Sequence, residues 1–233
     1  LFVDSLNRLR HDARIERNVL AFIMVPAWMK EARVDLKKRL SSKKVETDPC
    51  ENPRITHELY NQDEDKVLNQ MNWLGMHNAK DDKVKVVFVP CYLDGKDGIF
   101  NMHYYDLLIG NDLCAYPSYY EPWGYTPMES VAFAVPTITT NLSGFGRWVN
   151  AEGQNIDLGV GVVKRGDNNF DAVSDEIVAQ MEHIMEIAND AKQMKSVKTA
   201  AQSYAKKAQW KHFFKHYKVA YDIALRQCTM HNA

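Results

Sequence analysis

The chain has 233 residues, of which 45% are hydrophobic and 25% charged, and its formal net charge is −1. These values are ordinary for a soluble globular protein with room for one large α/β domain or two small ones. A charge this close to neutral gives no general electrostatic attraction to nucleic acid or to an anionic membrane, although it does not exclude a local basic patch.

The opening residues predict an amphipathic helix, because Phe2, Leu6 and Leu9 fall on one helical face. The helix is already under way at the first residue, which is not Met, so we expect further sequence upstream. The longest apolar run near the start, Val19–Val25, is too short to span a bilayer.

Apolar runs then alternate with helical patterns. Continuous apolar runs predict strands, the first of them buried on both faces, at 18–27, 83–90, 112–118, 136–140 and 160–163. Helical periodicity covers about 30–40, 64–76, 103–110, 127–134 and 170–226. The stretches at 41–53 and 141–146 are predicted to be loops, the second of them rich in glycine.

Strands separated by helices indicate an α/β fold with a Rossmann-like, doubly wound parallel sheet. We expect this domain to cover 1–170, with a helical and loop insertion at about 30–80. Helices from 171 to 233 form a C-terminal extension. Ligands of such sheets bind beyond the carboxyl ends of the strands, so the loops after strands are where a site is expected.

The last helix carries an aromatic face, because Phe213, Tyr217 and Tyr221 repeat every four residues. The simpler interpretation is a helix that faces the core. The alternative is a helix that docks against a missing domain.

Four cysteines stand at positions 50, 91, 114 and 228, without a C-x-x-C pair or a common zinc spacing. Such usage is typical of free thiols, and we expect a reducing, cytoplasmic compartment.

The stretch 115–146 has the composition of a binding site. Aromatic residues crowd the loop at 119–125, where exposed rings are costly unless they are used for recognition. Thr126 and Pro127 then predict a helix start, with Thr126 as the N-cap. The free amide groups of that first turn would suit a phosphate.

Two carboxylates flank this start, Glu121 before the turn and Glu129 after it. Both are placed to accept hydrogen bonds from sugar hydroxyls. However, T-P-M-E also fits a capping box, with Glu129 serving only the helix end, and Glu121 fits a solvated loop residue. Gly144 and Gly146 fit either a close approach to a ligand or, more simply, a turn.

The segments PSYYEPWGYTPMES and PTITTNLSGFG resemble the signature of glycogen synthases of the eukaryotic type, which are retaining glycosyltransferases with the two-domain GT-B fold. The E-x7-E pair of that class matches Glu121 and Glu129. A looser resemblance covers most of the chain, as the C-terminal, nucleotide-sugar-binding half of such an enzyme.

The resemblance implies roles residue by residue. Glu129 would hold the ribose hydroxyls of a UDP donor, and Glu121 would be the catalytic carboxylate beside the donor glucose. Tyr104 would stack on uracil, although without the resemblance Tyr104 and Tyr105 are more simply packing residues of a short helix. Further donor-binding positions would be Trp123, Gly124, Tyr125, Thr126 and Gly144.

The implied reaction moves glucose from UDP-glucose to the non-reducing end of an α-1,4-glucan, with retention and with no metal or other cofactor. The partners would be UDP-glucose, the glucan acceptor and the missing N-terminal domain, with a homo-oligomer left open and neither nucleic acid nor membrane expected. The family's Arg and Lys ligands of the diphosphate, which would lie just before the first helix, are absent here. We therefore expect this chain alone to be inactive.

The family's arginine-rich helix, which senses glucose 6-phosphate, would fall near 192–207, where this sequence has lysines and no arginine. Lysine lacks the bidentate fork of arginine, so weak or no control by this effector is implied.

Two other functions stay open. One keeps the fold and changes the donor, for example to ADP-glucose. The other is a non-catalytic module that holds glucan on Tyr119, Tyr120 and Trp123, because aromatic faces stack on sugar rings.

Overall fold

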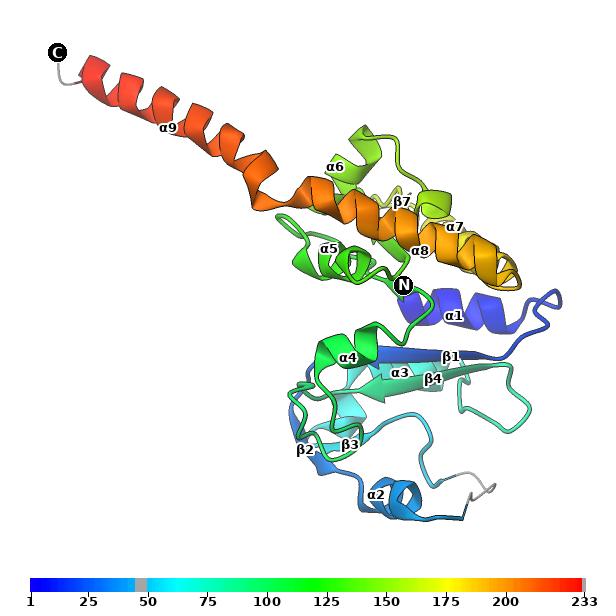
Figure 1. Ribbon diagram of the computed structural model, residues 1–233. Helices are drawn as coiled ribbons and strands as arrows, with labels where there is room; N and C mark the ends of the chain where they lie inside the picture. The colour runs from blue at the N-terminus through cyan, green and yellow to red at the C-terminus, as the bar shows by residue number, and fades with distance from the viewer. Residues whose placement is uncertain (45–49, 232–233) are drawn as a thin grey trace. The chain divides into compact units, whose positions relative to one another are not determined.

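The computed structural model describes residues 1–44 and 50–231 (Figure 1). The chain divides into two compact units, of which the first contains Leu1–Asn111 and Val163–Met185 and the second Asp112–Val162 and Glu186–Ala233. Parallel strands and helices occur in both, so the expected α/β class is confirmed. The predicted division at residue 170 stays a prediction.

Each unit has its own set of elements. The first contains α1 (Phe2–Arg10), β1 (Val19–Met24), β2 (Met29–Ala32), α2 (Val34–Ser41), β3 (His57–Leu59), the 3-10 turn η1 (Gln62–Glu64), α3 (Lys66–Trp73), β4 (Val84–Val89), α4 (Tyr104–Leu108) and most of α7 (Phe170–Ile187). The second contains β5 (Cys114–Ala115), α5 (Tyr125–Ala132), β6 (Thr137–Thr140), α6 (Gly144–Ala151), η2 (Ile156–Leu158), β7 (Val160–Val163), α8 (Ala191–Ala205), η3 (Lys206–Ala208) and α9 (Trp210–His231).

The first unit is built on the parallel pair β1 and β4, in register from Val19 opposite Val84 to Met24 opposite Val89. β4 is well covered, but β1 is only half-buried and Leu20 is 57% exposed. The prediction that this strand is buried on both faces is therefore wrong. Among the described residues β1 pairs with β4 alone, which makes it an edge strand.

A second, antiparallel pair corrects the helix expected over 30–40. Residues Met29–Ala32 form β2, which pairs with β3, and α2 begins only at Val34. Pairing with a distant segment overrides the helical pattern of a lysine-rich stretch. The expected loop at 41–53 holds for its described part except Ser41, which ends α2, while residues 45–49 lie outside the described residues.

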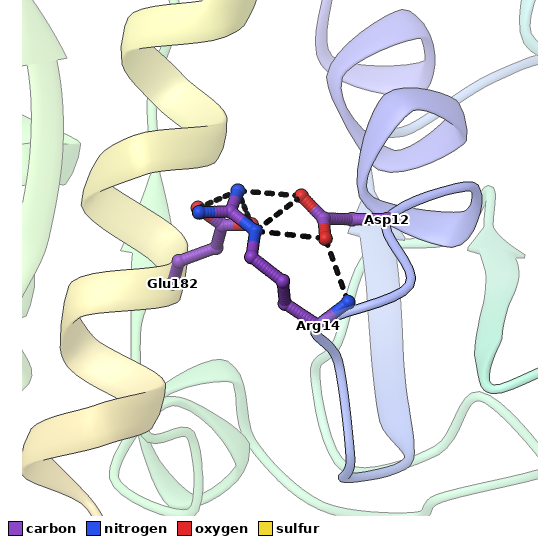
Figure 2. Close-up of polar contacts among 3 residues, drawn as sticks. All are labelled: Asp12, Arg14 and Glu182. Atoms are coloured by element: carbon purple, nitrogen blue, oxygen red, sulfur yellow. Dashed lines mark hydrogen bonds and ion pairs between the residues drawn. The ribbon is translucent and has the colours of Figure 1, made fainter.

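Arginine side chains tie the start of the first unit to α7. Arg14 lies between two carboxylates, with its Nη2 atom 2.6 Å from Asp12 and 2.9 Å from Glu182 of α7 (Figure 2). Arg8 pairs with Asp171 and Asp175 in the same way, one turn apart on that helix. Hydrogen bonds from Arg14 hold the pKa of Asp12 well below its usual range. This pairing therefore stabilises the folded state at pH values above the ordinary pKa of an aspartate. The stabilisation is lost as the pH falls through the lowered pKa of Asp12.

The second unit centres on the sheet β5-β6-β7, in which β5 and β6 are parallel. All four residues of β6 are buried, as are Val131 of α5, Val149 of α6 and Ala201 of α8. The helices therefore cover one continuous core around this short sheet.

The aromatic face of α9 is covered only at its start. Phe213 packs on rings of the second unit's core, whereas Tyr217 and Tyr221 are 45% and 56% exposed. Figure 1 shows α9 leaving α5 and α6 beyond its first turns. The core-facing interpretation therefore fails after Phe213, and docking on a missing domain stays a prediction. No helix among the described residues is long and apolar enough to cross a membrane.

The N-cap of α3 gives a direct test of this local architecture. The Asp65 carboxylate accepts hydrogen bonds from the amides of Val67 and Leu68, at 3.0 and 2.9 Å. We expect Asp65→Ala to lower the free energy of unfolding by about 1 kcal/mol, measured by urea denaturation. Asp63→Ala is the control, because its exposed carboxylate caps no helix, and an equal loss in both variants would contradict the cap.

Candidate functional site

The loop after β5 is held along the segment after β6 by a series of hydrogen bonds. Both the segment 116–123 and the segment 138–145 contribute main-chain groups, so the path of the loop is fixed independently of most side chains. The bonds run from Tyr116 N to Ile138 O (2.8 Å), Thr140 Oγ1 to Ser118 O (2.8 Å), Glu121 N to Leu142 O (3.3 Å), Gly144 N to Glu121 O (3.1 Å) and Phe145 N to Trp123 O (2.6 Å).

Gly144 makes this close approach possible. A Cβ atom at Gly144 would lie well under 3.0 Å from the carbonyl oxygen of Pro122, and one at Gly146 would clash with that of Thr140. Both glycines begin α6, with Ser143 as the N-cap, and the glycine loop expected over 141–146 is wrong in its second half. The close contact at Gly144 is with the chain itself, and its role toward a ligand stays a prediction.

The helix that follows the loop starts earlier than expected. Gly124, with φ of 108°, is the N-cap of α5, so the prediction of Thr126 as N-cap is wrong. This left-handed conformation suits glycine, and the held loop imposes it. Within the described residues, the amides of Gly124, Tyr125 and Thr126 have no hydrogen-bond partner. The helix end thus offers free donors at the positive end of its dipole.

The earlier start also decides between the two interpretations of Glu129. Counted from Gly124, Glu129 lies in the second turn of α5, so the T-P-M-E capping box is wrong. Glu129 is half-buried, and its carboxylate has no hydrogen bond or ion pair among the described residues. It shares a helix face with Tyr125, a residue that is 66% exposed. A half-buried carboxylate without a protein partner remains open to a ligand.

Glu121 lies at the same end of α5. Its Oε2 atom accepts a hydrogen bond from Ser118 Oγ at 3.1 Å and lies next to Gly124, where an added Cβ would be 3.3 Å away. Glu121 is half-buried and accepts this bond, and its role toward a ligand stays a prediction. Ser118 was missed by the sequence analysis, although its position three residues before Glu121 was the available signal.

Trp123 turns its ring away from the loop surface. The ring lies 5.1 Å from that of Phe213 and 6.1 Å from those of Phe145 and Trp148, measured between centroids. Trp148 in turn stacks on the buried Tyr204 at 5.0 Å. The expectation that Trp123 offers its ring to glucan is therefore wrong. Its backbone groups stay at the site.

The sequence-predicted residues thus fall into two sets. The second unit brings together Glu121, Trp123–Thr126, Glu129 and Gly144 around the start of α5. Tyr104 lies on α4 in the first unit, where its ring contacts that of Tyr105 at 5.4 Å. Its place relative to Glu121 stays a prediction.

The described residues include one cluster with the composition of a metal site, His57, Cys91 and Asp97 in the first unit. Both ring nitrogens of His57 already make hydrogen bonds within the chain. Nδ1 of His57 bonds with Thr56 Oγ1, and Nε2 of His57 bonds with the Asp97 carbonyl oxygen. The Asp97 carboxylate accepts the amides at 99–101. Burial, followed by the charge of Asp97, raises the pKa of Cys91 to about 11, which keeps the thiol protonated. These hydrogen bonds make the cluster part of a turn in the first unit.

Known proteins match this chain across the site. A family model described as glycogen synthase matches residues 28–232. The chain belongs to the glycogen synthase family. It is 34% identical to glycogen (starch) synthase of Neurospora crassa over 84% of this chain and 33% identical to isoform 2 of Saccharomyces cerevisiae over 75%.

The chain spans about a quarter of the length of these glycogen synthases, 27% of the first and 25% of the second. Among solved structures, Anabaena HepE in complex with UDP aligns with 95% of this chain and 52% of its own, at 18% identity and a TM-score of 0.44.

The close contact between Gly144 and the Pro122 carbonyl can be tested by substitution. Gly144→Ala forces a methyl group onto the Pro122 carbonyl, so we expect the free energy of unfolding to fall by about 1–3 kcal/mol in urea denaturation. Gly166→Ala is the control, because its added Cβ would meet nothing closer than 3.6 Å. The account of the held loop is wrong if both variants are equally stable.

Proposed function

We propose that this chain is the donor-binding part of a glycogen synthase that moves glucose from UDP-glucose to the non-reducing end of an α-1,4-glucan. Membership of the glycogen synthase family supports the general activity. The observation that carries the proposal is the start of α5, where free amides stand beside two carboxylates, Glu121 and Glu129.

In this proposal the α5 end receives the charged part of the donor. The free amides of Gly124, Tyr125 and Thr126 hold diphosphate oxygens and glucose hydroxyls, helped by the helix dipole. Glu129 accepts hydrogen bonds from the ribose hydroxyls, for which its unpaired carboxylate is suited. Glu121, fixed by Ser118, lies against the glucose, and Tyr104 stacks on uracil.

The same groups account for the reaction. The bond between glucose C1 and the diphosphate oxygen breaks, and the negative charge that develops on that oxygen is stabilised by preorganised amide donors. The acceptor hydroxyl attacks from the same face and passes its proton to the departing diphosphate, so that the configuration is retained. No protein nucleophile and no metal ion is needed in this scheme.

UDP binding tests the proposal most simply. We expect the chain to bind UDP with a dissociation constant at a roughly millimolar level, followed by ligand-observed NMR. Glu129→Ala removes charged hydrogen bonds worth about 1.5–3 kcal/mol, so we expect the affinity to fall at least ten-fold. The same titration with ADP in place of UDP tests the alternative in which ADP-glucose is the donor, which predicts tighter binding of ADP.

Glu152→Ala is the matched control for this titration. Glu152 is a carboxylate of the second unit at the end of α6, and it pairs with Lys207 at 3.6 Å. We expect UDP affinity to be unchanged in this variant. Unchanged affinity in Glu129→Ala, or no saturable UDP binding to the unmodified chain, would contradict the proposed donor site.

A further inference from the structure

Three side chains of the kinds that hold metal ions meet in the first unit, and the proposed function uses none of them. A ring nitrogen of His57, the Sγ atom of Cys91 and a carboxylate oxygen of Asp97 all lie within 4.8 Å of one another. His57 is fully buried and Cys91 is 4% exposed, while Asp97 is only half-buried, which gives an ion a path of entry. Imidazole, thiolate and carboxylate together are a donor set that suits Zn²⁺.

Thr56 decides how the His57 ring presents its nitrogens. Its Oγ1 atom donates to the Phe88 carbonyl oxygen at 3.3 Å and lies 2.8 Å from Nδ1 of His57. A hydroxyl group has one proton, so Oγ1 that donates to Phe88 can only accept from a protonated Nδ1. That tautomer leaves a lone pair on Nε2, which faces the Asp97 carbonyl oxygen at 2.9 Å.

Two lone pairs at this distance repel each other, and a cation that both atoms coordinate removes the repulsion. The other tautomer, in which Nε2 keeps a proton and donates it to the Asp97 carbonyl, is the form without an ion. The outer nitrogen of a metal-bound histidine is usually fixed by a hydrogen bond of the kind that Thr56 supplies here.

The Asp97 carboxylate is held in place before any ion binds. Its two oxygens accept hydrogen bonds from the amides of Ile99, Phe100 and Asn101, at 2.9, 2.8 and 2.8 Å. A carboxylate offers about four lone-pair positions, so these three bonds leave room for an ion. Such outer hydrogen bonds orient a ligand toward its metal.

The spacing of the ligand atoms is close to that of a zinc site. Zn²⁺ lies about 2.0–2.2 Å from nitrogen or oxygen and about 2.3 Å from sulfur, so tetrahedral ligands stand about 3.3–3.8 Å apart. The present separations are at most 4.8 Å, so a contraction of about 1 Å is enough. The Asp97 carbonyl oxygen, beside Nε2, is the nearest fourth ligand.

We propose that His57, Cys91 and Asp97 bind a structural zinc ion through Nε2, Sγ and the oxygen atoms of Asp97. The ion replaces the protons of Nε2 and Sγ, which pass to the solvent, because a coordinated thiol is deprotonated. It joins β3 to the loop between β4 and α4, and it stabilises the fold because it binds only the folded chain. The inference does not depend on the proposed function, and the ion takes no part in glucose transfer.

Titration of the chain with Co²⁺, which replaces Zn²⁺ in such sites, tests the proposal by visible absorption. We expect one equivalent to give the intense bands of tetrahedral cobalt and a thiolate-to-cobalt charge-transfer band, both of which Zn²⁺ displaces. Outer hydrogen bonds are worth roughly 10- to 100-fold in metal affinity, and a ligand is worth more. We therefore expect Cys91→Ala to abolish the charge-transfer band and to weaken Zn²⁺ binding at least about 100-fold.

Cys114→Ala is the matched control. Cys114 is also a buried free cysteine, but it lies on β5 in the second unit and belongs to no cluster of metal ligands within the described part of the chain. We expect this variant to keep the absorption bands and the zinc affinity. A charge-transfer band that survives Cys91→Ala, an equal loss in both variants, or no such band in the unmodified chain would each overturn the site.

X-ray absorption at the zinc edge tests the unmodified chain, and so does not depend on the folding of Cys91→Ala. We expect one sulfur at about 2.3 Å and three nitrogen or oxygen atoms at about 2.0–2.2 Å. A shell of nitrogen and oxygen alone would contradict the proposal. Several sulfur atoms would also contradict it, because they would mean that exposed cysteines such as Cys228 link two chains through the ion.

Discussion

The main-chain contact between the Pro122 carbonyl and Gly144 is the constraint on which the site depends. It allows the loop after β5 to run alongside the segment after β6, and the resulting hydrogen bonds set the path of the chain into α5. That path places Gly124 in a left-handed conformation as the N-cap, which leaves the first amides of the helix free. The same path brings Glu121 beside the helix end. A side chain at position 144 would disturb all of these features together.

Trp123 connects this outward-facing site to the core of the second unit. Its backbone belongs to the loop, while its ring packs among Phe145, Trp148 and Phe213. Because Phe213 lies in the first turn of α9, that helix is anchored directly beneath the loop. Rigid support of this kind keeps amide donors in place, so that they need not reorganise when negative charge develops on a bound group.

Periodicity in the sequence was enough to predict the α/β class and most of the elements, because apolar runs and amphipathic patterns are local signals. It failed where pairing between distant segments decides the structure. The sequence predicts a helix at β2, because the partner strand β3 is too short to show a pattern of its own. The Thr126–Pro127 signal placed the helix start two residues late, because the conformation of Gly124 is imposed by the loop. The closeness of Gly144 to Pro122 has no local signature in the sequence, because it joins two segments that are far apart along the chain.

The central claim is that the start of α5 binds the diphosphate of a nucleotide, and backbone amide NMR tests it most directly. On titration with UDP, the account predicts the largest shift changes at the amides of Gly124, Tyr125 and Thr126, with protection of these amides from hydrogen exchange. UDP that binds while these three amides neither shift nor become protected would contradict the account.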